Sequence, residues 1–373
     1  MPDQSRNPHL RMMAMLHARA AKLQKGESLA PPIVNAAKYA LPGEPDHAFP
    51  YGRFDNPTWA AVESAIGVLE DASTVCFPSG MAAVTGAIMA CLKPKAKLLL
   101  PSDGYYTVRV LVDEFLRQHD IDVTEVPTAK MDAQDVAGFD LVWLETPSNP
   151  GLDVCDIAAI AKRVHAAGGL VCVDNTTATA LLQPVLDLGA DLTVSSDTKA
   201  LSGHSDVLFG HVASRDVALI ERVRTWRKLS GATPGPAEAY LAYRGLMTLD
   251  LRLERMCANA EALANLFYTH KTVEAVRFPG LADDPSYNTA TRQMARPGFV
   301  IGITFADAAT AERFIDDCPA IFAATSFGGI QTSGERRTRW GDDVAEGYVR
   351  LSVGCEPTGA LVAAISDTLD SLA

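Results

Sequence analysis

Short apolar runs alternate with amphipathic stretches along the middle of this chain, and the alternation limits the possible folds more than any other feature. The predicted strands are 73–77, 97–100, 121–126, 141–144, 170–173 and 191–195, and the amphipathic or helical segments are 59–69, 81–92, 108–118 and 157–166. Strands that alternate with helices form a mostly parallel sheet with helices on both faces. We therefore predict an α/β domain over residues 56–240.

The two flanks of this region have a different character. Residues 1–55 are predicted to form an irregular arm that lies over another part of the assembly, because five prolines between residues 31 and 50 interrupt any long element. In residues 241–373, alternating strands at 299–305 and 348–353 and helices at 309–317 and 361–372 follow a long helical region, 237–270. This pattern predicts a smaller α+β C-terminal domain.

Composition excludes several classes of protein. Of the 373 residues, 48% are hydrophobic and 21% charged, as in a globular protein, and the net charge of −12 opposes binding to nucleic acid. No apolar run is long enough for a membrane span, and the N-terminus has no signal-peptide pattern. Seven cysteines without a CxxC pair indicate reduced thiols, and the eight histidines show no metal-binding spacing. We expect a cytoplasmic protein without a metal.

Three polar segments follow predicted strands or open a helix, at the edge where open α/β sheets bind ligands. They are Ser79-Gly80-Met81, Asp174-Asn175-Thr176 and Ser196-Asp197-Thr198-Lys199. Each has an ordinary reading on its own: a turn, a helix cap, and a loop lysine bonded to carbonyls. Together they supply a lysine amine, a carboxylate, and hydroxyl and amide donors for a phosphate. Pyridoxal 5′-phosphate (PLP) requires this combination.

The segment from Ser195 to Asp206 resembles the lysine motif of the Cys/Met metabolism PLP-dependent enzymes. That family includes cystathionine γ-synthase, cystathionine γ- and β-lyases, methionine γ-lyase and homoserine sulfhydrylases. Further segments resemble the family in order along nearly the whole chain: 51–53 with 56–58, 79–81, 103–105, 145–150, 174–176, 244–249, 278–281, 326–329 and 350–354. The resemblance implies the PLP-dependent transferase fold type I, which is similar to aspartate aminotransferase, and a PLP-binding role for residues 56–240.

The resemblance also implies roles for individual residues around the cofactor. Lys199 would carry PLP as a Schiff base and move substrate protons, and Tyr105 would stack on the ring close to those protons. Asp174 would pair with the pyridine nitrogen and Asn149 would lie near the 3-oxygen. The phosphate would be held by Gly80, Met81, Ser196 and Thr198.

Four further residues are implied in substrate binding and assembly. Arg350, assisted by Ser326, would bind the α-carboxylate of a sulfur amino acid substrate. Tyr51 and Arg53 would reach the phosphate in a neighbouring subunit, so that a homodimer or homotetramer would share its active sites. Without the resemblance, Arg350 would be read as a surface ion pair and Tyr105 as a core residue.

The chain departs from the family pattern at Asp197, Ala200 and Gln331, where a small residue, a large apolar one and a glutamate are usual. Its C-terminal half most resembles cystathionine γ-lyases, which release cysteine, 2-oxobutanoate and ammonia. The alternatives are cystathionine γ-synthase or O-acyl-homoserine sulfhydrylase, then cystathionine β-lyase, and a PLP-binding homologue without catalysis. Methionine γ-lyase is disfavoured, because Tyr106-Thr107 follows Tyr105 where that enzyme usually has a cysteine.

Overall fold

A seven-stranded sheet forms the centre of the molecule in the computed structural model, which describes residues 7–372. The strands lie in the order β1-β7-β6-β5-β4-β2-β3, and β7 runs antiparallel to β1 and β6 on either side of it, whereas the other pairs are parallel. They are β1 Ser73–Phe77, β2 Lys97–Pro101, β3 Asp122–Val126, β4 Leu141–Glu145, β5 Leu170–Asp174, β6 Leu192–Ser195 and β7 Gly210–Ser214. The predicted α/β fold with a mostly parallel sheet is confirmed.

The central strands are apolar on both faces because helices cover both faces. In β4, Leu141 and Trp143 belong to one core with α3 (Gly80–Cys91) and α7 (Val217–Ser230). Val142 and Leu144 belong to a second core with α5 (Ile157–Ala166) on the opposite side. Successive side chains of a strand point to opposite faces, so this buried strand has no polar position until Glu145 at its end.

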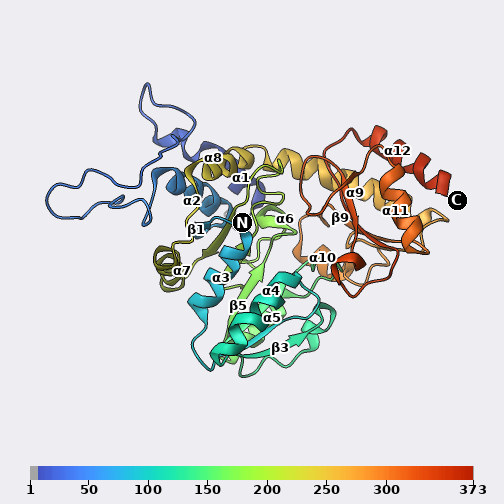
Figure 1. The fold of residues 1–373 in the computed structure, drawn as a ribbon, viewed down its shortest axis with the longest axis horizontal. Coiled ribbons are helices and arrows are strands. Elements are labelled where there is room, and N and C mark those ends of the chain that lie inside the picture. The colour runs from blue at the N-terminus through green and yellow to red at the C-terminus, as the bar shows by residue number, and fades with distance from the viewer. Residues whose placement is uncertain (1–6, 373) are drawn as a thin grey trace.

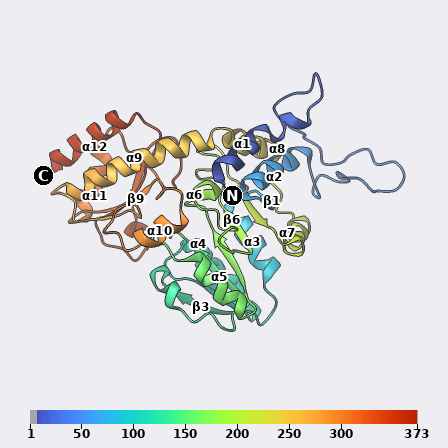
Figure 2. The same ribbon diagram turned by 180° about the vertical axis from the view of Figure 1, so that it is seen from behind.

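A second sheet lies in the C-terminal part, in the order β10-β11-β12-β9-β8. Its strands are β8 Ala275–Arg277, β9 Val300–Thr304, β10 Phe322–Ala323, β11 Ser333–Arg336 and β12 Tyr348–Ser352. Three helices share a core with this sheet: α9 Leu249–Thr269, α11 Ala308–Asp317 and α12 Thr358–Leu372. Figure 1 shows α9 running from the central part of the molecule into this C-terminal part, and Figure 2 shows the same arrangement from behind.

The N-terminal region is less irregular than predicted. Pro8–Ala18 forms the helix α1, which begins with Asn7 as its cap and buries Met12 and Met15 against α2 (Pro57–Glu70). The five prolines all lie after this helix, so they do not interrupt it. From about residue 23 the chain is extended and mostly exposed, and it projects from the side opposite the C-terminal part (Figure 1).

Two other predictions about elements were incomplete. The single helical region expected over 237–270 is two helices, α8 (Pro236–Leu246) and α9, because the chain turns at Met247 and Thr248. Strand β7 was not predicted, since His211 and Ser214 interrupt its apolar pattern. The remaining helices are short: α4 Tyr106–Leu111, α6 Thr179–Leu182 and α10 Tyr287–Gln293. No helix within residues 7–372 combines the length and the apolar character that a membrane crossing needs.

Candidate active site

A cavity of about 380 Å³ lies where the carboxyl ends of β4, β5 and β6 meet segments of the C-terminal part. The structure brings ten of the twelve predicted site residues to its wall. They are Gly80, Met81, Tyr105, Asn149, Asp174, Ser196, Thr198, Lys199, Ser326 and Arg350.

Lys199 is held in this cavity by the C-terminal part of the chain. Its Nζ donates a hydrogen bond of 2.5 Å to Ser326 Oγ and lies 5.3 Å from the centre of the Phe327 ring. Burial lowers the pKa of the Lys199 amine, and the Arg350 guanidinium lowers it further, to about 8. The neutral, nucleophilic fraction of this amine near neutral pH is therefore larger than in an ordinary lysine.

Two buried carboxylates stand at the ends of adjacent strands. Asp174 and Glu145 are register partners on β5 and β4. Glu145 accepts hydrogen bonds from the backbone N–H of Tyr105 at 2.7 Å and of Asn149 at 2.9 Å. Burial, and then the charge of Asp174, raise the pKa of Glu145 to about 8. Burial also raises the pKa of Asp174, although Thr176 donates hydrogen bonds to it. A cationic ligand group beside Asp174 would stabilise its charged form and so offset the effect of burial.

The other end of the cavity is lined by small polar groups at a helix N-terminus. Helix α3 begins at Gly80 and is capped by Ser79 Oγ, which accepts from Ala82 N at 3.1 Å. A Cβ on Gly80 would lie 2.5 Å from Ser196 Cβ, so only glycine allows the helix to approach the turn after β6 so closely. This turn is fixed by Thr176 Oγ1, which accepts from Ser196 N at 2.8 Å. Free N–H groups and hydroxyls of this kind suit a phosphate.

Arg350, on β12, extends from the second sheet to the first. Its Nη1 donates to Asn149 Oδ1 at 2.5 Å, its Nη2 donates to Ser326 O at 3.0 Å, and it forms a buried ion pair with Glu335. Within residues 7–372, no acceptor bonds its buried Nε. Burial, and then the charge of Arg337, lower the pKa of Arg350 to about 10.

Ser326, the hydrogen-bond partner of Lys199, lies in an unusual backbone conformation. Ser326 has a φ of 82°, in the left-handed region that residues with a side chain seldom adopt. The following Gly328 also has a positive φ, and a Cβ there would lie 2.4 Å from Ala200 N. Ala200 is fully buried under this segment. Because Gly328 has no side chain, the C-terminal segment can approach the backbone beside the cofactor lysine predicted at position 199.

Tyr51 and Arg53 are the two predicted residues that do not reach the cavity within one chain. They line a separate surface hollow, where Arg53 Nη1 donates to Lys228 O at 2.7 Å. Among the departures from the family pattern, Asp197 is fully buried and turned toward His211 instead of the cavity, and Gln331 is exposed outside it.

Residue-by-residue reasoning from the sequence missed several members of the cavity. Glu145 could have been found from the sequence, because it ends an otherwise apolar buried strand. Burying a carboxylate costs free energy unless it is paired or hydrogen-bonded, so such a residue is a candidate for a functional site. Arg337 and Trp340 also line the wall. Trp340 Nε1 and Arg337 Nη1 donate to Glu335, at 2.8 and 2.7 Å. No sequence periodicity marks this irregular segment.

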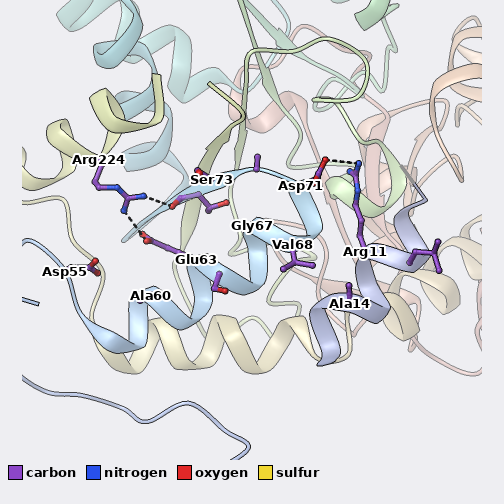
Figure 3. A pocket seen from close by; sticks show the side chains of 14 residues that line it. Arg11, Ala14, Asp55, Ala60, Glu63, Gly67, Val68, Asp71, Ser73 and Arg224 are labelled. Carbon is purple, nitrogen blue, oxygen red and sulfur yellow. Dashed lines mark hydrogen bonds and ion pairs between the residues drawn. The ribbon is translucent and has the colours of Figure 1, made fainter. Parts of the chain in front are cut away.

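A larger hollow, of about 840 Å³, lies on another face between α1 and α2 (Figure 3). Two ion pairs lie in its wall: Arg224 with Glu63 at 3.4 Å and Arg11 with Asp71 at 3.7 Å. None of the twelve predicted site residues lines it. The smaller cavity is therefore the candidate active site.

Comparison with known proteins identifies the family of this chain. The model of the family described as Cys/Met metabolism PLP-dependent enzyme matches residues 13–370. A Streptomyces coelicolor protein provisionally named cystathionine γ-lyase is 46% identical, over 93% of this chain and 90% of its own length. Cystathionine γ-synthase of Mycobacterium bovis is 36% identical, over 86% of each chain.

A solved structure supports the same relationship. The crystal structure of metB from Corynebacterium glutamicum superposes with a TM-score of 0.93 at 32% identity, and covers 98% of this chain and 100% of its own. Both the sequence match and the fold extend over nearly the full length. The chain therefore belongs to the Cys/Met metabolism enzymes that depend on pyridoxal 5′-phosphate.

Proposed function

We propose that this protein is a carbon–sulfur lyase that cleaves cystathionine at its γ-carbon and releases cysteine, 2-oxobutanoate and ammonia. One observation carries the proposal: the Lys199 amine, with its lowered pKa, lies in the same cavity as the buried Arg350 guanidinium. A base and a carboxylate-binding group therefore lie close enough to act on the same small substrate. The enzyme would act in the cytoplasm on a sulfur amino acid.

The residues of the cavity fit PLP. Gly80 leaves a space that a Cβ would fill, beside the hydroxyls of Ser196 and Thr198, and these groups with Met81 would hold the phosphate. Asp174 would hold the ring nitrogen, with its raised pKa offset by that cation. Asn149 would lie near the ring oxygen and Tyr105 against the ring face. Lys199 would bind the cofactor covalently through its amine.

When bound, the cofactor supplies an electron sink for charge that develops on the substrate carbon atoms. Lys199 accepts the proton of the substrate α-carbon and delivers protons to the atoms that require them. The Ser326 hydroxyl, 2.5 Å from Nζ, limits where the amine can move. Tyr105, anchored through its backbone to Glu145, is the second candidate for moving a proton.

Arg350 would bind the α-carboxylate of the substrate. Its Nε is buried without a partner within residues 7–372, so a bound carboxylate would satisfy a donor that burial otherwise penalises. Glu335 and Asn149 fix the guanidinium plane from the other side. A planar, fixed guanidinium selects for carboxylates that it can bind in a bidentate fashion.

The choice of reaction rests on similarity and on one sequence feature. The relative with 46% identity carries the name of a γ-lyase, and Tyr106 and Thr107 follow Tyr105 where methionine γ-lyases usually have a cysteine. The competing reaction is γ-replacement, which the similarity to cystathionine γ-synthase favours. Arg337 and Trp340 border the same cavity, and they favour neither reaction.

Product analysis tests the proposal. Incubation with cystathionine should yield cysteine and 2-oxobutanoate. Homocysteine and pyruvate would instead identify a β-lyase. A γ-synthase or sulfhydrylase would consume an O-acyl-homoserine only when cysteine or sulfide is supplied. Absence of turnover with all of these substrates, in a protein that binds PLP, would leave the non-catalytic homologue as the answer.

We also propose that two subunits share each active site, in a homodimer or a dimer of such dimers. Tyr51 and Arg53 lie on the extended N-terminal arm, outside the cavity of their own chain. Tyr51 is 42% exposed and stacks edge-on with Phe54, close to Arg53. An exposed aromatic ring and an exposed guanidinium that lie outside the cavity of their own chain are suited to the phosphate end of a partner's cavity.

A further inference from the structure

A chain of three buried ionisable side chains lies directly behind the turn that carries Lys199. His211 Nδ1 is 2.7 Å from Asp197 Oδ1, and His211 Nε2 is 3.3 Å from Glu70 Oε1. Asp197 and His211 are fully buried, and Glu70 is 3% exposed. The three residues come from the turn after β6, from β7 and from the end of α2, so the chain joins elements that are distant in sequence.

The position of Asp197 within the turn is specific. Ser196, Thr198 and Lys199 all line the active-site cavity, whereas Asp197 lies behind it. His211 stands opposite Ser195 in the antiparallel β6–β7 pair, at the strand end from which the turn begins. The Asp197–His211 contact therefore ties the middle of the turn to the neighbouring strand.

Other contacts hold the same turn on both sides of Asp197. Thr176 Oγ1 accepts from Ser196 N at 2.8 Å, and Thr198 Oγ1 accepts from Phe209 N at 3.0 Å. The Asp197 side chain is directed away from the cavity and into the protein. The backbone of the turn is bonded as well, because Thr198 N donates to Phe209 O at 3.1 Å and Ser202 N donates to Asp197 O at 3.0 Å. The contact of the Asp197 side chain with His211 adds a tether from the middle of the turn to β7.

The cost of burying these charges limits the net stability that the arrangement contributes. Buried ion pairs are weak stabilisers, because the cost of removing two charges from water offsets most of their attraction. Within the described residues, Asp197 Oδ2 also lacks a hydrogen-bond donor, which adds to that cost. Burial by itself would lower the pKa of His211, but Asp197 and Glu70 outweigh it and raise the pKa to about 10. The imidazolium is therefore charged near neutral pH, and the contact is charge-assisted.

We propose that Asp197 and His211 are positioning residues whose buried contact holds the turn so that Ser196 and Thr198 face the cofactor phosphate and Lys199 faces the cavity. The inference rests on the phosphate role proposed above for Ser196 and Thr198. It also gives a physical reason for Asp197, the departure from the family pattern that the reaction itself does not use.

The test compares cofactor affinity with protein stability. Asp197→Ala removes the contact with His211. Asp197→Asn has a side chain of the same shape as aspartate, and it can still accept a hydrogen bond from the His211 imidazole without a negative charge. Asp191→Ala is the matched control, because Asp191 pairs with His165 at 2.9 Å at the opposite end of β6, away from the cavity. For each holoenzyme, equilibrium dialysis followed by visible absorbance measures PLP dissociation, and urea titration measures unfolding.

We expect Asp197→Ala to weaken PLP binding by about tenfold or more, which is the effect of losing one charged hydrogen bond. Asp197→Asn should stay within about threefold of wild type, since its tether remains. Asp191→Ala should lose stability and keep its affinity. Wild-type PLP affinity in Asp197→Ala would overturn the inference, because the contact would then contribute to folding alone.

Two further variants keep the test decisive. If Asp197→Ala does not fold, the triple variant Glu70→Gln/Asp197→Ala/His211→Val removes the charge at all three buried positions. It should fold and still bind PLP about tenfold more weakly than the wild type. Ser196→Ala/Thr198→Ala tests the phosphate site itself. Unchanged affinity in that double variant would reject the proposed phosphate role. Weakened affinity there, with wild-type affinity in Asp197→Ala, would reject the positioning role alone.

Discussion

Lys199 is the side chain on which the proposed chemistry depends most directly. Replacing it with alanine should abolish the yellow absorbance of covalently bound PLP and lower turnover of cystathionine by about a thousandfold, because the amine is both the attachment point and the base. Absorbance spectra and product assays on purified Lys199→Ala measure both effects. Lys162→Ala is the control, since Lys162 is an exposed residue of α5 outside the cavity. An active, yellow Lys199→Ala would contradict the assignment.

His211 should make stability depend on pH in a defined window. Its pKa is about 10 in the folded protein and 6.5 as an ordinary histidine, so its stabilising proton is present in both states below pH 6.5. Between these values the folded state alone retains the proton, and stability is lost as the pH rises toward 10. The slope from this group approaches about 1.4 kcal/mol per pH unit.

Urea unfolding of wild type and His211→Gln between pH 7 and 9 measures this dependence. The wild type should lose stability with rising pH more steeply than the variant, because glutamine does not titrate. Equal slopes would show that the imidazole is neutral over this range and that Asp197 and Glu70 do not hold its proton.

The start of α3 illustrates how an element is placed by a single glycine. Gly80→Ala would push a methyl group to 2.5 Å from Ser196, so the helix and the turn after β6 would have to separate. We expect PLP affinity to fall by about tenfold, with a smaller change in turnover of the fully loaded enzyme. Gly359→Ala is the control: Gly359 lies in α12 with open space around it, and alanine there should raise stability by about 0.5–1 kcal/mol. Wild-type PLP affinity in Gly80→Ala would refute the close approach.

Most of the secondary structure could be predicted because hydrophobic periodicity determines it locally. Strand β1 and helix α5 were predicted with the bounds that the structure has. Strand β7 was not predicted, because its polar residues are buried next to partners that are distant in sequence. His211, for example, contacts Asp197 and Glu70. Periodicity records which face is apolar, and it contains no information about which polar side chains are paired.

Arg252 shows the same limit at the site. In the sequence it belongs to a row of charges with helical spacing, which suggests an exposed helix face. In the structure it is buried, and its guanidinium donates to the carbonyls of Ala200, Leu201 and Gly245 at 2.6 to 3.0 Å. Helix α9 begins at Leu249, and the break before it places the Arg252 side chain against the segment that follows Lys199. Tertiary contacts of this kind overrule the local pattern.

The arrangement of subunits can be tested by combining defective chains. We expect Lys199→Ala and Arg53→Ala each to be impaired alone. In a hybrid dimer, one site would hold the intact Lys199 of one chain and the intact Arg53 of the other. Co-expression of equal amounts should therefore restore about a quarter of wild-type activity, since half of random dimers are hybrids and each has one intact site. Activity no greater than the mean of the two parents would contradict shared sites.

Polar contacts join the two walls of the cavity. Arg350 bonds Asn149, Lys199 bonds Ser326, and Tyr348 Oη donates to Pro150 O at 2.7 Å. A ligand that contacts both walls adds its binding energy to this junction, by about 2.7 kcal/mol at a hundred times its dissociation constant. The concentration of substrate and cofactor would then determine how cooperatively the central and C-terminal parts of the protein unfold. It would also determine how long the protein resists proteolysis. A shortage of substrate or cofactor would shorten the lifetime of the protein as well as slow its turnover.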